Sequence, residues 1–165
     1  MISSILDIAT SQTSIVKMKR PFHLYLTIMD ILIINGPNLN KLGVREPDIY
    51  GSETMYDVAR KIIQETGVDL EVWQSNHEGD IIDKIWSSYQ KKIIINAGGF
   101  SHYSVAIRDA ISGSGKDFIE VHISDVENRE DFRKTLILKD VCIDFISGEG
   151  VDGYQIAVDK FIKKA

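Results

Sequence analysis

Residues 31–51 read I-L-I-I-N-G-P-N-L-N-K-L-G-V-R-E-P-D-I-Y-G. The first four are apolar and mostly β-branched, which predicts a short strand buried on both faces, as in a parallel sheet covered by helices. The 17 residues from Asn35 to Gly51 then form a strand-to-helix connection, far longer than the usual ~2–6 residues. Open α/β sheets bind ligands at such connections, so this loop is a candidate site. The alternative is an ordered Ω-loop without chemistry.

Apolar runs and amphipathic segments alternate along the rest of the chain. The segment near 54 begins with a capping-box pattern, Thr54 and Asp57, and Gly67 is a candidate helix C-cap. We expect strands at 31–35, 68–74, 92–96, 118–122 and 142–147, with helices beginning near 54, 78, 102 and 154. These units predict a single α/β domain, a flavodoxin-like, doubly wound, five-stranded parallel sheet with strand order 2-1-3-4-5.

Composition limits the classes of function. The chain has 165 residues, which fits one domain, and a net charge of −5, which argues against a general nucleic-acid binder. Small anions remain possible ligands, because local arginines can override the net charge. Cys142 is the only cysteine, so we expect no intrachain disulfide, no cysteine-based metal site and a cytoplasmic location. No apolar run approaches the roughly 20 residues of a membrane span, so we expect no membrane partner.

Polar residues directly follow the apolar runs at four predicted strand ends. They are Asn35, Gln74-Ser75, Asn96 and His122-Ile123-Ser124. Each could be an ordinary turn or cap by itself. Because the carboxyl ends of parallel strands meet at one edge of a sheet, the four together predict a ligand site there.

The long loop carries a candidate base and a cation that could support it. Tyr50 has an ordinary pKa near 10, so it can act as a base only if its phenolate is stabilised. Arg45, in the same loop, could supply that stabilisation, since a nearby cation favours the charged form of an acid. The alternative is that the Tyr50 ring simply packs the loop.

Other titratable residues lie near the predicted strand ends. Glu120 and His122 are two apart in a strand, so both side chains project to the same face, where the carboxylate could orient the imidazole as a general acid. A histidine hydrogen-bonded at a strand end is the alternative. His102 lies in the turn that opens the third helix, where main-chain N–H groups are free. Arg129 and Arg133 are either a solvated face or a clamp for a carboxylate or hydroxyl.

Several familiar site types are absent from the sequence. There is no G-x-G-x-x-G or P-loop after the first strand, no G-x-S-x-G, and no zinc-ligand spacing among the four histidines. The remaining groups suit proton abstraction beside a carbonyl, followed by loss of a leaving group. The alternative is a flavodoxin-like module that binds a nucleotide or flavin at the same edge, which the missing phosphate loop disfavours.

Five ordered motifs carry a family resemblance. They are I-N-G-P-N-L-N-x-L-G-x-R-E-P-x-I-Y-G at 34–51, Q-S-N-H-E-G at 74–79, I-N-A-G-G-F-S-H-Y-S-V-A-I-R-D-A at 95–110, I-E-V-H-I-S at 119–124 and R-E-D-F-R at 129–133. In these motifs the chain resembles type II 3-dehydroquinate dehydratase, over nearly everything after Asp30. The resemblance implies dehydration of 3-dehydroquinate to 3-dehydroshikimate in the shikimate pathway. The implied reaction is an anti elimination through an enolate, without cofactor, metal or Schiff-base lysine.

The resemblance also implies catalytic roles. Tyr50 is expected to remove the proton beside the ketone, with Arg45 supporting its phenolate. Asn38 is expected to hold a water at the enolate oxygen. His122, oriented by Glu120, is expected to protonate the departing hydroxyl. An assembly-only homologue without turnover is the alternative, and the presence of the expected base and acid argues against it.

Substrate binding and assembly are implied in the same way. Asn96, His102 and Arg133 are expected to bind substrate hydroxyls, and the main-chain N–H groups of Ile123 and Ser124 are expected to bind its carboxylate. Asp109 is expected to reach a neighbouring subunit's site, within trimers that assemble into a homododecamer.

The chain departs from the family pattern after Arg133. Residues 135–140, T-L-I-L-K-D, replace the usual H-S-x-x-S-P stretch, Asp144 stands where a small residue is typical, and Asp125 replaces an asparagine. No catalytic position is lost. The packing of the fifth strand and the assembly are the features affected, because a carboxylate on a strand needs a partner or water.

Residues 1–29 precede the predicted domain, which spans 30–165. Pro21–Met29 is apolar enough to form an extra strand or a packed arm. We expect this segment to be an appendage and hypothesise that Met18 or Met29 is the natural start. Detection of Met1 at the native N-terminus by mass spectrometry would contradict that hypothesis.

Overall fold

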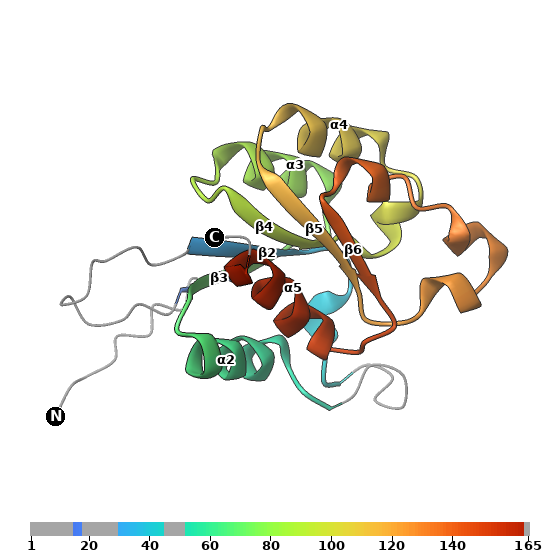
Figure 1. Cartoon of the computed structure of the whole chain (residues 1–165). Helices are drawn as coiled ribbons and strands as arrows, with labels where there is room; N and C mark the ends of the chain where they lie inside the picture. Colours follow the sequence, from blue (N-terminus) through green and yellow to red (C-terminus); the bar gives the residue numbers. More distant parts are fainter. Residues whose placement is uncertain (1–14, 18–29, 45–51, 164–165) are drawn as a thin grey trace, which may run out of the picture.

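A computed structural model describes residues 15–17, 30–44 and 52–163 of the chain (Figure 1). Its sheet has the order β1-β3-β2-β4-β5-β6. The strands are β1 (Ile15–Lys17), β2 (Asp30–Asn35), β3 (Asp69–Gln74), β4 (Lys92–Asn96), β5 (Asp117–His122) and β6 (Asp144–Ser147). The pairs from β3 to β6 are all parallel. This confirms the predicted five-stranded parallel sheet and its 2-1-3-4-5 order.

A further strand lies at the edge of this parallel sheet. β1 pairs antiparallel with β3, with Ile15 opposite Trp73 and Lys17 opposite Glu71. It belongs to the segment that we expected to be an appendage. The expected strand or arm at Pro21–Met29 lies outside the described residues.

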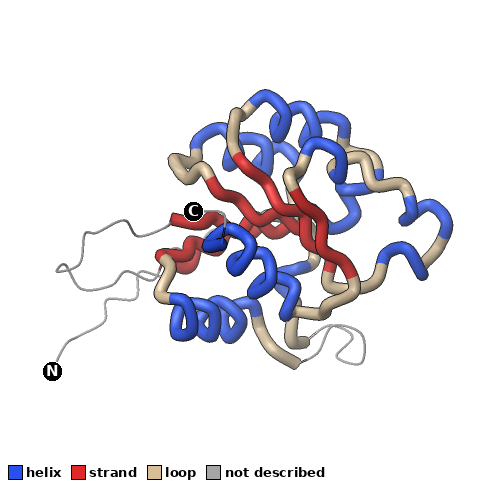
Figure 2. The backbone as a smooth tube through the Cα atoms, in the orientation of Figure 1, coloured by secondary structure: helices blue, strands red, loops and turns tan. Residues whose placement is uncertain are grey.

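Helices cover both faces of the sheet (Figures 1 and 2). α2 (Met55–Thr66) and α5 (Asp152–Lys163) pack on one face, and α3 (Glu78–Ser87) and α4 (Val105–Gly113) on the other. Ile31 and Ile33 point into the first layer, while Leu32 and Ile34 point into the second. None of the four has any exposed surface, which explains why this strand is apolar without alternation. Among the described residues, no helix is long and apolar enough to cross a membrane.

Local signals set the helix ends. The hydroxyl of Thr54 accepts a hydrogen bond from the Asp57 N–H, and the Asp57 carboxylate accepts one from the Thr54 N–H, which confirms the capping box. These bonds to Thr54 lower the pKa of Asp57. α2 ends at Gly67, in the left-handed region with a φ of 72°. The third helix differs from its expected bounds, because a 3-10 helix, η2 (Gly98–His102), precedes α4, which is capped by Ser104.

The unusual carboxylate of the last strand has a partner. The Asp144 Oδ2 lies 2.6 Å from the Lys160 Nζ on α5. Asp144 also begins β6, two residues later than the expected start at Cys142. Lys160 is therefore the partner that the sequence analysis expected a carboxylate on this strand to need.

The loops after the two central strands approach each other closely. The Gly36 N–H donates to the Asn96 carbonyl at 2.7 Å. A Cβ atom at Gly36 would lie 2.4 Å from the main-chain oxygen of Ala97, so no side chain fits there. This contact brings the long loop after β2 against the turn after β4.

We expect Gly36→Ala to destabilise the protein by about 1–3 kcal/mol or more, because backbone must move to admit the new methyl group. Gly79→Ala is the matched control: Gly79 is helical and a Cβ there meets nothing within 4 Å, so this change should stabilise by up to about 1 kcal/mol. Urea unfolding midpoints measure both. Equal midpoints for the two variants would contradict the packing argument.

Candidate active site

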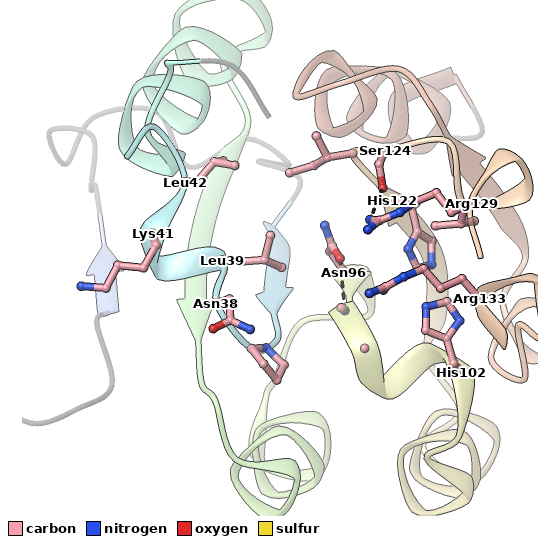
Figure 3. Close-up of a pocket in the computed structure, with 15 residues that line it drawn as sticks. Asn38, Leu39, Lys41, Leu42, Asn96, His102, His122, Ser124, Arg129 and Arg133 are labelled. Atoms are coloured by element: carbon pink, nitrogen blue, oxygen red, sulfur yellow. Dashed lines mark hydrogen bonds between the residues drawn. The ribbon is translucent and has the colours of Figure 1, made fainter. Parts of the chain in front are cut away.

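A cavity of about 200 Å³ lies at the carboxyl edge of the sheet (Figure 3). It is enclosed by the loop after β2, by η2 after β4 and by the segment that follows β5. The described residues that line it are Pro37, Asn38, Leu39, Lys41, Leu42, Asn96, Gly98, Gly99, His102, His122, Ile123, Ser124, Val126, Arg129 and Arg133. The cavity is therefore at the place predicted from the polar strand ends.

The charge of the cavity is opposite to that of the chain. Lys41, Arg129 and Arg133 line it, and no carboxylate is among its described lining residues. The chain as a whole carries a net charge of −5. Local cations in a concave, partly enclosed site set the potential that a ligand meets, so the cavity favours a small anion.

A buried carboxylate–imidazole pair forms one wall of the cavity. The Glu120 Oε1 lies 2.9 Å from the His122 Nε2. Glu120 has no exposed surface and His122 is 5% exposed. Because a carboxylate only accepts, the Nε2 must carry the proton, which leaves the Nδ1 to hold or release the transferable proton. The second oxygen of Glu120 has no hydrogen-bond partner within the described part of the chain.

A second histidine stands beside this pair. The His102 Nδ1 lies 2.9 Å from the Thr135 carbonyl, so Nδ1–H donates and Nε2 is left as the acceptor of the neutral ring. Its ring centroid is 6.1 Å from that of His122. Burial lowers the pKa of His102, the Thr135 carbonyl opposes that shift, and the His122 and Arg133 charges add to it. His102 is therefore neutral near pH 7.

Asn96 is held by a buried hydrogen-bond network. Its Nδ2 lies 3.0 Å from the Tyr154 hydroxyl, and its Oδ1 accepts from the Gly98 N–H at 3.2 Å. The Tyr154 hydroxyl in turn donates to the Asn35 Oδ1 at 2.7 Å. Three elements, β2, β4 and α5, thus meet at one amide on the floor of the cavity.

The opposite wall of the cavity comes from the long loop. Asn38 has a φ of 68°, a left-handed conformation that asparagine tolerates better than most residues. Its N–H donates to the Asn76 Oδ1 at 2.9 Å, and the Gln74 Nε2 donates to the same oxygen at 3.0 Å. These bonds fix the main chain of Asn38 and leave its side chain at the cavity.

The segment after β5 offers donors to an anion. The N–H groups of Ile123 and Ser124 donate to no other group within the described residues. The Arg129 Nη1 donates to the Ser124 Oγ at 3.3 Å. The Glu130 Oε2 lies 2.9 Å from the Arg133 Nε and 3.4 Å from the Arg129 Nε. One carboxylate outside the cavity thus positions both guanidinium groups.

Most of the residues that the sequence singled out lie together. Those lining the cavity are Asn38, Asn96, His102, His122, Ile123, Ser124 and Arg133, with Glu120 behind His122. Asp109 is exposed on α4 and does not line the cavity of its own chain. Tyr50 and Arg45 lie outside the described residues.

Eight of the lining residues were not assigned to the site from the sequence, among them Leu39, Lys41 and Arg129. Lys41 and Leu39 lie within the long loop, and Arg129 is four residues before Arg133. The spacing of the two arginines was a usable signal for Arg129, but a solvated face gives the same pattern. Among the described residues, no group of three or more His, Cys, Asp or Glu could hold a metal ion.

Comparison with known proteins gives a consistent result. The family model for dehydroquinase class II matches residues 29–162. A 3-dehydroquinate dehydratase of Prochlorococcus marinus is 50% identical over 140 residues, which cover 82% of this chain and 95% of that protein. One from Francisella tularensis subsp. novicida is 49% identical over 133 residues, covering 79% and 92%.

Solved structures agree. The type II dehydroquinase of Butyrivibrio crossotus is similar with a TM-score of 0.76 and 45% identity, over 82% of this chain and 98% of that one. The type II dehydroquinase of Propionibacterium acnes has a TM-score of 0.77 and 37% identity, over 82% and 97%.

The depressed pKa of His102 makes stability depend on pH. Above an ordinary histidine pKa of 6.5, both folded and unfolded states hold the ring neutral and its contribution is fully present. Between the unfolded-state pKa and the lower folded-state pKa, the unfolded state binds a proton and the folded state does not. The free energy of unfolding therefore decreases as the pH falls through the folded-state pKa. We expect His102→Gln, which retains a donor for Thr135, to reduce this loss. Urea midpoints between pH 8 and 5 measure it, and parallel curves for the two proteins would contradict the assignment.

Proposed function

The chain belongs to the class II dehydroquinase family, and on that premise we propose how its residues remove water from 3-dehydroquinate. The family assignment makes it a 3-dehydroquinate dehydratase of the shikimate pathway. The observation that carries the mechanism is the buried Glu120–His122 pair, 2.9 Å apart, at the wall of a cation-lined cavity. That arrangement suits protonation of a leaving group on an anionic substrate.

Binding begins with the substrate carboxylate. We assign it to the main-chain N–H groups of Ile123 and Ser124, which are unused within the described residues. Arg129 and Arg133 add positive charge at the same side of the cavity. We assign Asn96, His102 and Arg133 to contacts with the substrate's hydroxyl groups.

Proton removal is assigned to the long loop. By motif, the Tyr50 phenolate takes the proton from the carbon beside the ketone, and the C–H electron pair becomes the enolate. A nearby cation favours the phenolate over the phenol, and we assign that support to Arg45 in a site from which water is excluded. Asn38 holds the water that donates to the enolate oxygen.

The second half of the reaction expels the hydroxyl. The enolate re-forms the ketone, its electron pair makes the new C=C bond, and the C–O bond on the opposite face breaks. The His122 Nδ1 supplies the proton that converts the departing hydroxide into water. Glu120 keeps the imidazole oriented through its hydrogen bond to the His122 Nε2.

The test is the appearance of the enone absorbance of 3-dehydroshikimate when 3-dehydroquinate is added. We expect Tyr50→Phe to lower kcat by about 10²–10⁴-fold, the usual contribution of a general base. Glu120→Gln retains an acceptor for His122 but loses the charge, and should lower kcat by at least about tenfold. Tyr56→Phe is the control, since Tyr56 is exposed on α2 and should turn over like the wild type. Unchanged kcat in Tyr50→Phe would remove Tyr50 from its role.

We also propose that the chain assembles as a tetramer of trimers in which Asp109 enters a neighbour's site. Asp109 is exposed on α4, near Tyr103 and Val105, which are 64% and 60% exposed. Large apolar side chains exposed together are typical of an interface. Light scattering should give the mass of a dodecamer, and Asp109→Ala should raise KM. A monomer with full activity would contradict this proposal.

The cytoplasmic location stays a prediction.

A further inference from the structure

Tyr154 is a buried polar residue that the mechanism above does not use. It lies in the first turn of α5, more than 50 residues beyond Asn96 in the chain, and has no exposed surface. The sequence gives it only as part of the apolar stripe of the final helix. We propose that Tyr154 is a positioning residue that fixes the amide of Asn96, so that Asn96 meets the substrate as a hydrogen-bond donor. This inference rests on the proposed substrate-binding role of Asn96.

The direction of each hydrogen bond follows from one main-chain donor. The Gly98 N–H can only donate, so the atom 3.2 Å from it must be the oxygen of the Asn96 amide. The nitrogen of that amide then lies toward Tyr154, at 3.0 Å from its hydroxyl oxygen. The hydroxyl accepts there, and its single proton is directed to the Asn35 Oδ1, 2.7 Å away.

The network leaves one N–H of the Asn96 amide free to donate a hydrogen bond. Its oxygen is engaged by Gly98 and one of its two Nδ2 hydrogens by Tyr154. The remaining hydrogen can serve a ligand oxygen in the cavity, where Figure 3 shows the amide between the long loop and His122. Asn96 therefore offers a ligand a hydrogen-bond donor, while its oxygen already accepts from Gly98.

His102 has the complementary character. Its Nδ1–H is used by the Thr135 carbonyl, so its Nε2 accepts. A hydroxyl group both donates and accepts, so hydroxyl groups of a ligand can accept from Asn96 and donate to His102.

Burial keeps the network in one protonation state. It raises the pKa of Tyr154 far above its ordinary value, and the hydrogen bond from Asn96 only partly offsets that shift. The phenol therefore keeps its proton near pH 7, where its oxygen accepts from Asn96 and its proton is directed to Asn35.

Steady-state kinetics with 3-dehydroquinate test the inference through a double-mutant cycle. Tyr154→Phe removes the hydroxyl and keeps the ring, which frees the Asn96 amide to rotate. We expect KM to rise by about 3–10-fold, the value of one hydrogen bond, with a smaller change in kcat. In an Asn96→Ala background the same change should leave KM unaltered, because there is no amide left to position.

A matched control separates positioning from packing. Phe161 is 1% exposed on the same helix and in the same apolar layer, and Phe161→Leu should lower the thermal midpoint but leave KM at the wild-type value. An equal KM rise for Tyr154→Phe in both backgrounds, or no rise in either, would overturn the inference.

Neutron diffraction from the wild-type protein gives a test that needs no variant. It should show the phenol deuterium of Tyr154 directed at the Asn35 oxygen and an Asn96 Nδ2 deuterium directed at the phenol oxygen. A phenol deuterium directed at Asn96 would overturn the inference. Wild-type protein that fails to turn over 3-dehydroquinate would contradict the proposed function instead, and the neutron result decides the amide orientation independently of turnover.

Discussion

The complete burial of the two central strands is the constraint on which the site depends. Residues 31–34 of β2 and 93–95 of β4 have no exposed surface, because helices cover both faces of the sheet. A polar side chain inside such a strand would need a buried partner. Polarity is therefore confined to the strand ends, where Asn35 and Asn96 stand opposite each other. The cavity lies at the strand ends because the buried strand interiors exclude polar side chains.

Glu120 is a carboxylate with no exposed surface inside this sheet, and the free-energy cost of burying it indicates a functional role. It lies inside β5 with no exposed surface, and its described partner is the His122 ring. A buried ion pair is often no more stable than an apolar replacement, whereas removing one partner costs about 3–5 kcal/mol. Stability alone therefore gives no reason for a carboxylate here. A carboxylate here is explained instead by its orienting the His122 imidazole against the cation-lined cavity.

The sequence was sufficient where a signal is local or periodic. The apolar run at 31–34, the Thr54 capping box and the strand-end residues all follow from patterns that one segment carries by itself. Features made by distant segments were not predictable in this way. β1 pairs with β3 across more than 50 residues, and Tyr154 has the spacing of a core residue, so nothing in its own segment indicates hydrogen bonds to Asn35 and Asn96. Residue chemistry made Tyr50 a candidate base with Arg45 as its support, and the family resemblance supplied the specific step proposed for them.

The divergent segment after Arg133 shows why the site can survive a change of sequence beside it. Thr135 meets His102 through its main-chain carbonyl, so the interaction does not depend on the Thr135 side chain. Leu138 is fully buried in the layer of α3 and α4, and Arg108 holds Asp140 through two hydrogen bonds of 2.6 and 3.0 Å. The segment is thus anchored by a buried leucine and by an arginine–aspartate pair. The contact with His102 depends on the path of the main chain, and these anchors hold that path.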